Sequence, residues 1–137
     1  MKKIILDTNV LISFLTDRDL AQQEKAEEIF AQAAALRTEI LCQQEVISEF
    51  VYVMNSVYQV SKNEIRSMLL DFADMPGIEI VSGLDLAIVS QLWPAQISDY
   101  GDAVIASLCK KTRDSAVATF DRKLIKELTA AGLAVID

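Results

Sequence analysis

Apolar residues along the chain fall into two alternating patterns, short continuous runs and longer stretches with helical spacing. Short runs bounded by polar or turn residues are typical of strands buried inside a sheet. The predicted strands span residues 3–6, 39–42, 78–81, 116–120 and 133–136.

Between the short runs, apolar positions recur every three or four residues, which predicts amphipathic helices. The stretch 19–37 is the strongest of these because it is rich in Ala, Glu, Gln and Lys. The stretch 43–58 could be a strand by composition, but Val46, Phe50 and Val57 fit the helical period, so we predict a helix. The predicted helices span residues 8–16, 19–37, 43–58, 61–75, 84–93, 100–114 and 121–131.

Strands that alternate with helices predict an α/β fold with a central, mainly parallel sheet. The length of 137 residues is that of one domain, and the chain has no repeat, linker or low-complexity segment. We therefore expect one domain over residues 1–137, in which the helix-rich part 19–75 flanks the sheet.

The absence of histidine limits the chemistry open to this chain. It excludes Ser-His-Asp triads, Cys-His dyads and His-ligated zinc. The four glycines form neither a Walker loop nor a GxGxxG turn. Cys42 and Cys109 are far apart in apolar surroundings, so we interpret them as reduced thiols of a cytoplasmic protein. No apolar run approaches the roughly 18 residues of a membrane span.

Charge is unevenly distributed, although the net charge of −7 does not suggest a nucleic-acid-binding protein. Residues 67–109 contain six acids and no Lys or Arg, whereas residues 110–126 contain six bases and two acids. This pattern fits either a solvated helix face or a basic rim beside an acidic pocket. The six bases are Lys110, Lys111, Arg113, Arg122, Lys123 and Lys126.

Two acids directly follow predicted strands, Asp7 after residues 3–6 and Asp121 after residues 116–120. Ligands of parallel α/β sheets gather outside the carboxyl ends of the strands, so these two acids are candidate site residues. The alternative is that each only caps the helix that follows.

Three further acids stand at unusual positions. Glu49 lies on the helical face of Val46 and Val53, where a carboxylate is paired, protonated, metal-bound or at the edge of the face. Asp99 and Asp102 have the spacing of an acidic capping box, yet Asp102 leads directly into an apolar run.

If three or more of these acids converge, their repulsion requires cations to neutralise it. A site of oxygen ligands without His or Cys selects Mg²⁺ or Mn²⁺. Such a site suits phosphodiester cleavage, in which the metal activates water and stabilises the leaving oxygen. Thr8, Asn9 and Thr119 would then orient carboxylates or metal-bound waters.

Four segments, in order along the chain, resemble motifs of the PIN domain family. They are "IILDTNVLI", "VISEFVYV", "GDAVIASL" and "ATFDRKLIK". The resemblance implies a PIN-like α/β/α sandwich and an acidic quartet that binds Mg²⁺ or Mn²⁺. Carried over residue by residue, that quartet is Asp7, Glu49, Asp102 and Asp121. Asn9 and Thr119 match polar positions common in the family, whereas Asp99 lies outside the general quartet.

A chain of this size also resembles the VapC-like toxins of toxin–antitoxin pairs. This resemblance implies a metal-dependent endoribonuclease, a homodimer, and a small antitoxin whose tail covers the acidic groove. The apolar helices around residues 46–58 and 64–72 are candidate dimer contacts. We expect water to attack the RNA phosphate, which leaves a 5′-phosphate and a 3′-hydroxyl, while the basic residues steer the RNA backbone.

Three alternatives differ from the toxin hypothesis. A phosphoacceptor receiver domain has similar architecture but needs two adjacent acids after the first strand, whereas Thr8 and Asn9 follow Asp7. A silent PIN scaffold would bind RNA or a partner without cleavage. A PIN nuclease of RNA processing would cleave RNA without being a toxin.

Overall fold

The computed structural model describes residues 1–136, which form five strands and seven α-helices. The strands are β1 (Lys2–Leu6), β2 (Thr38–Gln43), β3 (Ile78–Val81), β4 (Ser115–Ala118) and β5 (Val135–Ile136). The helices are α1 (Thr8–Leu15), α2 (Leu20–Ala34), α3 (Gln44–Tyr52), α4 (Lys62–Ala73), α5 (Leu86–Leu92), α6 (Tyr100–Lys111) and α7 (Arg122–Ala130). Every predicted strand and helix is therefore present within the described residues.

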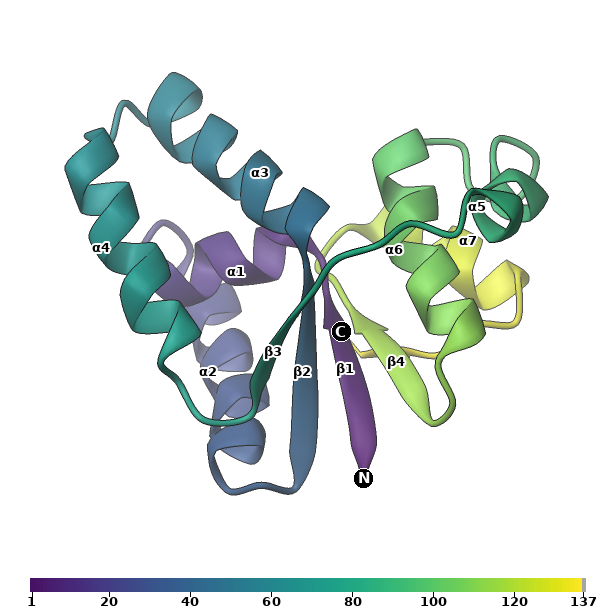
Figure 1. Ribbon diagram of the computed structural model, residues 1–137, viewed down its shortest axis with the longest axis horizontal. Helices are drawn as coiled ribbons and strands as arrows, with labels where there is room; N and C mark the ends of the chain where they lie inside the picture. Colours follow the sequence, from purple (N-terminus) through teal and green to yellow (C-terminus); the bar gives the residue numbers. More distant parts are fainter. Residues whose placement is uncertain (137) are drawn as a thin grey trace.

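The strands form one sheet in the order β3-β2-β1-β4-β5, and every pair of neighbours is parallel. Helices α1 to α4 cover one face and α5 to α7 the other, so the molecule has three layers (Figure 1). The prediction of an α/β sandwich with a mainly parallel sheet is confirmed. Since the strands are parallel, the residues that follow β1, β2 and β4 lie at the same end of the sheet, outside the carboxyl ends of the strands.

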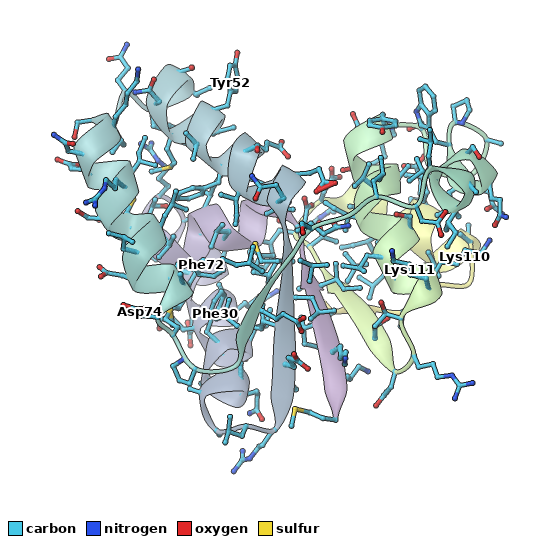
Figure 2. All side chains as sticks on the ribbon, viewed as in Figure 1. Phe30, Tyr52, Phe72, Asp74, Lys110 and Lys111 are labelled. Atoms are coloured by element: carbon cyan, nitrogen blue, oxygen red, sulfur yellow. The ribbon has the colours of Figure 1, made fainter. Side chains whose placement is uncertain are left out.

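The sheet is buried because both of its faces carry apolar side chains. Ile5, Leu6 and Val117 in the central strands are fully buried. In the layer of α1 to α4, Phe30 stacks on Phe14 with ring centroids 3.8 Å apart and meets the edge of Phe72 (Figure 2). This packing joins α1, α2 and α4 into one layer.

Most helices begin at a side chain that accepts a hydrogen bond from the first turn, which explains where they start. The predicted Ser61 cap of α4 is present, with Ser61 Oγ 3.2 Å from the Glu64 backbone nitrogen. The capping residues of this kind are Asp7, Asp19, Ser61, Asp85, Asp99 and Asp121. Capping is thus real at three of the candidate site acids.

The predicted helices 19–37 and 100–114 extend three residues beyond the observed ends of α2 and α6. The largest departure lies in the stretch 43–58, where α3 ends at Tyr52 and a π-helical turn, Val53–Val57, follows. The Tyr58 backbone nitrogen donates to the Val53 oxygen at 3.1 Å, one residue further back than in an α-helix. Val53 and Met54 are adjacent apolar residues, and the wider turn brings Met54 into the core at 1% exposure.

None of the helices in the described residues is long and apolar enough to cross a membrane.

Candidate metal and active site

Asp7 occupies the centre of the candidate site, at the junction of β1 and α1. Its backbone nitrogen donates to the Ala118 oxygen of β4 at 2.9 Å, so the sheet itself holds the residue. Its side chain is 7% exposed, with Oδ1 accepting from the Thr8 backbone nitrogen and Oδ2 from Thr119 Oγ1, both at 2.7 Å. Asp7 is therefore a helix cap and also a buried carboxylate with a fixed orientation.

Burial raises the pKa of the Asp7 carboxyl, and the hydrogen bonds from Thr119 and Thr8 partly oppose this effect. The negative charges of Glu49 and Asp121 raise the pKa further. The electrostatic effect shows that carboxylates from three different elements of the sandwich act on one another.

Thr8 connects Asp7 to α3, because its hydroxyl donates to Glu49 Oε2 at 2.8 Å. Thr8 itself is buried, whereas Glu49 is exposed. Of the alternatives for Glu49, the structure shows a position at the edge of the apolar face. From that edge its carboxylate still points back to the Asp7 centre through the Thr8 hydroxyl.

Thr119 connects Asp7 to the end of β4, and it is fully buried. Its Oγ1 donates to Asp7 and accepts from the Asp121 backbone nitrogen at 3.0 Å. Asn9 joins the same junction, since its Oδ1 accepts from the Phe120 backbone nitrogen at 3.3 Å. One hydroxyl thus sets the relative positions of two candidate acids.

Asp121 is exposed and caps α7, with Oδ1 accepting from the Lys123 and Leu124 backbone nitrogens at 2.9 and 3.3 Å. These hydrogen bonds use one oxygen and leave Oδ2 available. Asp99 caps α6 in the same way, through the Asp102 backbone nitrogen at 3.0 Å. Capping and ligand binding therefore do not exclude each other at these positions.

Asp102 has the most perturbed carboxyl of the candidate acids. It is half-buried in the first turn of α6, and its side chain accepts no hydrogen bond from residues 1–136. Burial, and then the charges of Asp7, Asp99, Asp121 and Glu127, raise the pKa of Asp102 to about 7. Apart from the helix dipole, no group of the described chain is seen to stabilise the charge of this carboxylate, so a cation could bind here.

The acids of the site have no basic partner. Within residues 1–136 the only ion pair joins Lys3 and Glu39, which lie in β1 and β2. Burying carboxylates without a counter-ion costs free energy. A bound cation would lower that cost by neutralising the charge of the acids.

The predicted basic rim is divided by the fold, and half of it does not lie beside the acids. Lys110 and Lys111 are at the end of α6 that leads into β4 (Figure 2), and Arg113 follows them. Eight residues of helix place Lys110 about 12 Å from Asp102 along the axis. Only Arg122, Lys123 and Lys126 belong to the helix that starts at a candidate acid.

Glu127 on α7 also acts on the site, and the sequence analysis missed it. Its Oε2 accepts from the Ser98 backbone nitrogen at 3.1 Å, and its charge raises the pKa of Asp102. Leu124 and Leu128, both buried, share its helix face. The argument that singled out Glu49, an acid beside an apolar stripe, would have found Glu127 as well.

The donor set fits a hard divalent cation, because it consists of carboxylate, hydroxyl and amide oxygens without a counter-charge. Within residues 1–136 no three acids already converge as a closed metal cage would require. Mg²⁺ does not need such a cage, since it usually binds one or two carboxylates and keeps several waters.

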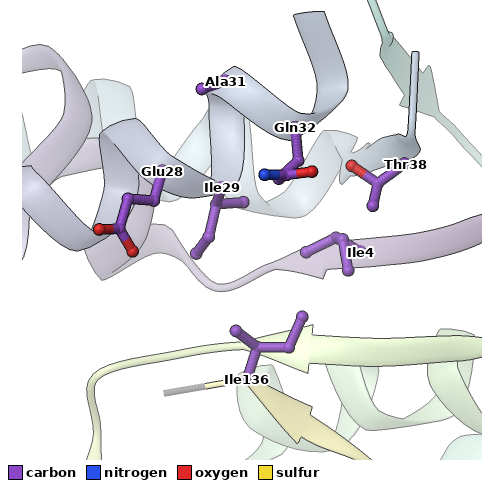
Figure 3. A pocket seen from close by; sticks show the side chains of 7 residues that line it. All are labelled: Ile4, Glu28, Ile29, Ala31, Gln32, Thr38 and Ile136. Atoms are coloured by element: carbon purple, nitrogen blue, oxygen red, sulfur yellow. The ribbon is translucent and has the colours of Figure 1, made fainter. Parts of the chain in front are cut away.

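The three main hollows of the described chain lie away from these acids. One, of about 510 Å³, lies between α2 and the sheet and is lined mainly by Ile4, Ile29 and Ile136 (Figure 3). A second, of about 480 Å³, borders α4, and a third, of about 690 Å³, is lined mainly by the segment from the end of α1 to the start of α2. Glu49, Asp99 and Asp121 are exposed, so a polymer can reach these acids from solvent.

Comparison with known proteins gives one family match and several structural neighbours. The PIN domain family model matches residues 4–129. VapBC2 from Rickettsia felis, solved bound to a DNA fragment from its promoter, has a TM-score of 0.68 and 18% identity over 98% of this chain and 97% of that one. VapBC-1 from nontypeable Haemophilus influenzae has a TM-score of 0.64 and 14% identity, with 98% and 97% covered.

A third neighbour is the PIN domain endonuclease Utp24, with a TM-score of 0.50 and 17% identity over 92% of this chain and 76% of that one. No curated protein matches the chain. At these identities the neighbours show the fold, and they confirm the predicted PIN-like sandwich.

Proposed function

The chain belongs to the PIN domain family, and on that premise we propose that it is a metal-dependent endoribonuclease. One observation carries the proposal, the uncompensated Asp102 carboxyl beside the Asp7 centre, with its pKa raised to about 7. The four acids near Asp102 make its charge unfavourable, which serves no purpose in a residue that only caps a helix. A site that binds a divalent cation requires such a concentration of negative charge.

In this proposal Asp7, Asp102 and Asp121 hold Mg²⁺ or Mn²⁺. Such an ion supplies Lewis acidity, which activates water and neutralises charge on the phosphate. Glu49 joins these ligands or orients the attacking water through Oε1, since Oε2 already accepts from Thr8. Thr8 and Thr119 keep the carboxylates in place by hydrogen bonds that fix their rotamers.

In this proposal water, and not the 2′-hydroxyl of the RNA, attacks the phosphate. The water oxygen bonds to phosphorus, the bond from phosphorus to the 3′ oxygen breaks, and that oxygen takes a proton. The products carry a 5′-phosphate and a 3′-hydroxyl. Arg122, Lys123 and Lys126 follow Asp121 on α7 and would attract the RNA backbone despite the net charge of −7.

The test is cleavage of a defined single-stranded RNA by purified protein with Mg²⁺ or Mn²⁺, repeated with EDTA. We expect cleavage that EDTA abolishes, with products that a 5′-phosphate-dependent exonuclease degrades. Products that end in a 2′,3′-cyclic phosphate would contradict water attack, because that group forms when the 2′-hydroxyl attacks.

We further propose that the protein is the toxin of a toxin–antitoxin pair and acts in the cytoplasm as a homodimer. Two structural neighbours, VapBC2 and VapBC-1, support the toxin–antitoxin part of this proposal. A small antitoxin would place an Arg or Lys among acids that have no basic partner in the described chain. Tyr52 and Leu70, exposed at 67% and 50%, lie in the helices expected to form the dimer.

The toxin role is tested by growth after induced expression of wild type and Asp7→Asn, with and without the neighbouring reading frame. We expect arrest by wild type only, and rescue by the neighbour. If RNA is cleaved in vitro but growth continues, the protein is a PIN nuclease of RNA processing. Metal binding without cleavage of any RNA would favour the silent scaffold.

A further inference from the structure

Two exposed aromatic side chains, Trp93 after α5 and Tyr100 at the start of α6, stand against each other beside the candidate acids. Their ring centroids are 5.3 Å apart and the ring planes meet at 82°. Trp93 is 40% exposed and Tyr100 43% exposed. We propose that this aromatic pair is a stacking platform for a nucleobase of single-stranded RNA, next to the phosphate that is cleaved. The inference rests on the proposed nuclease function.

The pair belongs to the site because of its place in the chain. Asp99, which caps α6, immediately precedes Tyr100, and the backbone nitrogen of Ser98 donates to Glu127 on α7. The charges of both Asp99 and Glu127 act on Asp102. A base that stacks here therefore lies at the N-terminal end of α6, where Asp99 and Asp102 also stand, although Tyr100 and Asp102 point to different sides of the helix. Asp99 and Asp121 are exposed, so they remain accessible to a strand that stacks on the pair.

The platform is held rigidly, and the backbone of Ser98 is the main anchor. The Ser98 oxygen accepts from Trp93 Nε1 at 3.1 Å, and the Ser98 nitrogen donates to Glu127 Oε2 at 3.1 Å. Ile97, the preceding residue, is fully buried. The loop between α5 and α6 is thus fixed to α7 on one side and to the indole on the other.

Rigid, solvent-facing aromatic rings suit a nucleobase for two reasons. Their order is established before binding, so little conformational entropy is lost. Every base has a π-face, and stacking on protein aromatics is a main source of affinity for single strands. The indole N–H of Trp93 already donates to the Ser98 oxygen, so Trp93 would contact a base through the face of its ring rather than by a hydrogen bond. A duplex keeps its bases stacked inside and would gain nothing from the platform.

The experiment exploits the fact that Trp93 is the only tryptophan in the chain. Its fluorescence is recorded while wild-type protein is titrated with a 12-nucleotide RNA, with Ca²⁺ replacing Mg²⁺, and a gel verifies that the strand stays intact. Matched probes are the same strand in a duplex and an abasic strand of equal length and charge. We expect strong quenching by the single strand and little by the other two.

Three variants accompany the titration. Trp93→Leu keeps an apolar side chain without a π-system, and we expect about tenfold weaker binding of the single strand by fluorescence anisotropy. Trp93→Phe keeps a ring face, so we expect most of the affinity to remain. Leu86→Ala removes a residue of α5 that is 60% exposed and is the control for general loss of apolar surface. Circular dichroism verifies that each variant is folded.

The platform is refuted if the single strand binds without quenching, if the abasic strand quenches equally, or if no strand binds. Equal losses in Trp93→Leu and Leu86→Ala would also refute it and would indicate an apolar surface for a protein partner. RNA cleavage separates the two proposals. Wild-type rates in Trp93→Leu would overturn the platform alone, whereas no cleavage by wild type would overturn the nuclease.

Discussion

Replacing Asp102 by Asn is predicted to stabilise the protein at pH 8 when no divalent cation is present. The pKa of the Asp102 carboxyl is raised from 3.8 to about 7, so the folded state disfavours its charge. A shift of about 3 units corresponds to about 4 kcal/mol before screening. Because the side chain is half-buried, solvent screening reduces this to about 1–2 kcal/mol.

One effect opposes the gain. Asp102 lies in the first turn of α6, where a negative charge interacts favourably with the helix dipole, and losing it costs about 0.3–1 kcal/mol. The net stabilisation expected from Asp102→Asn is therefore about 1 kcal/mol at pH 8, or roughly 3–5 °C in Tm.

The pH dependence carries a definite sign. The folded state binds the Asp102 proton more tightly than the unfolded state, so between about pH 7 and pH 4 the folded protein holds more protons. For this group, stability is greatest at low pH and is lost as the pH rises through about 7. The advantage of Asp102→Asn should accordingly be smaller at pH 5 than at pH 8 and disappear near pH 4.

The assay is urea unfolding of wild type and Asp102→Asn at pH 8 and pH 5 in EDTA, followed by circular dichroism. Asp74→Asn is the matched control, because Asp74 is exposed at the far end of α4 (Figure 2). Adding Mg²⁺ at pH 8 should stabilise wild type more than the variant. An Asp102→Asn variant that is no more stable than wild type at pH 8 would refute the view of Asp102 as an uncompensated charge.

Three other substitutions test separate parts of the structure. Thr119→Val removes the hydroxyl that joins Asp7 to Asp121, so kcat/KM for RNA should fall about 10–100-fold. Thr119→Ser keeps the hydroxyl and should retain activity. Equal rates for wild type and Thr119→Val would refute the orienting role. Lys123→Glu should weaken RNA binding and reduce the salt slope by about 1, whereas Lys110→Glu should not; an unchanged slope in Lys123→Glu would remove α7 from the RNA path. Gly77→Ala would place Cβ 2.5 Å from the Ala33 oxygen at φ +79°, so urea unfolding should show a loss of about 2 kcal/mol or more; wild-type stability would show that the turn adapts.

The sequence was a good guide wherever a local pattern determines the structure. The apolar run before Asp7 predicts a buried strand, and this strand alone is enough to place the Asp7 carboxylate at its carboxyl end. The spacing of Asp99 and Asp102 likewise predicts the start of α6. These features depend only on residues that are close together in the sequence, so the sequence pattern is enough to predict them.

Features that depend on packing between distant segments could not be predicted in the same way. The contact of Glu127 with Ser98 requires α7 to pack against the loop before α6. The basic run that starts at Lys110 looks continuous along the chain, but the length of α6 carries its first half away from the acids. Either Val53 or Met54 could have been the buried residue of this helix face. Packing against the rest of the core determines that it is Met54.

The measurement that tests the central claim most directly compares RNA cleavage by wild type, Asp7→Asn and Asp74→Asn. Each protein is stripped of metal with EDTA and assayed over a titration of Mn²⁺ or Mg²⁺, and circular dichroism verifies folding. The account predicts metal-dependent cleavage by wild type and Asp74→Asn, and a loss of at least about 100-fold in Asp7→Asn. Equal cleavage by all three folded proteins would contradict the assignment of catalysis to the Asp7 centre.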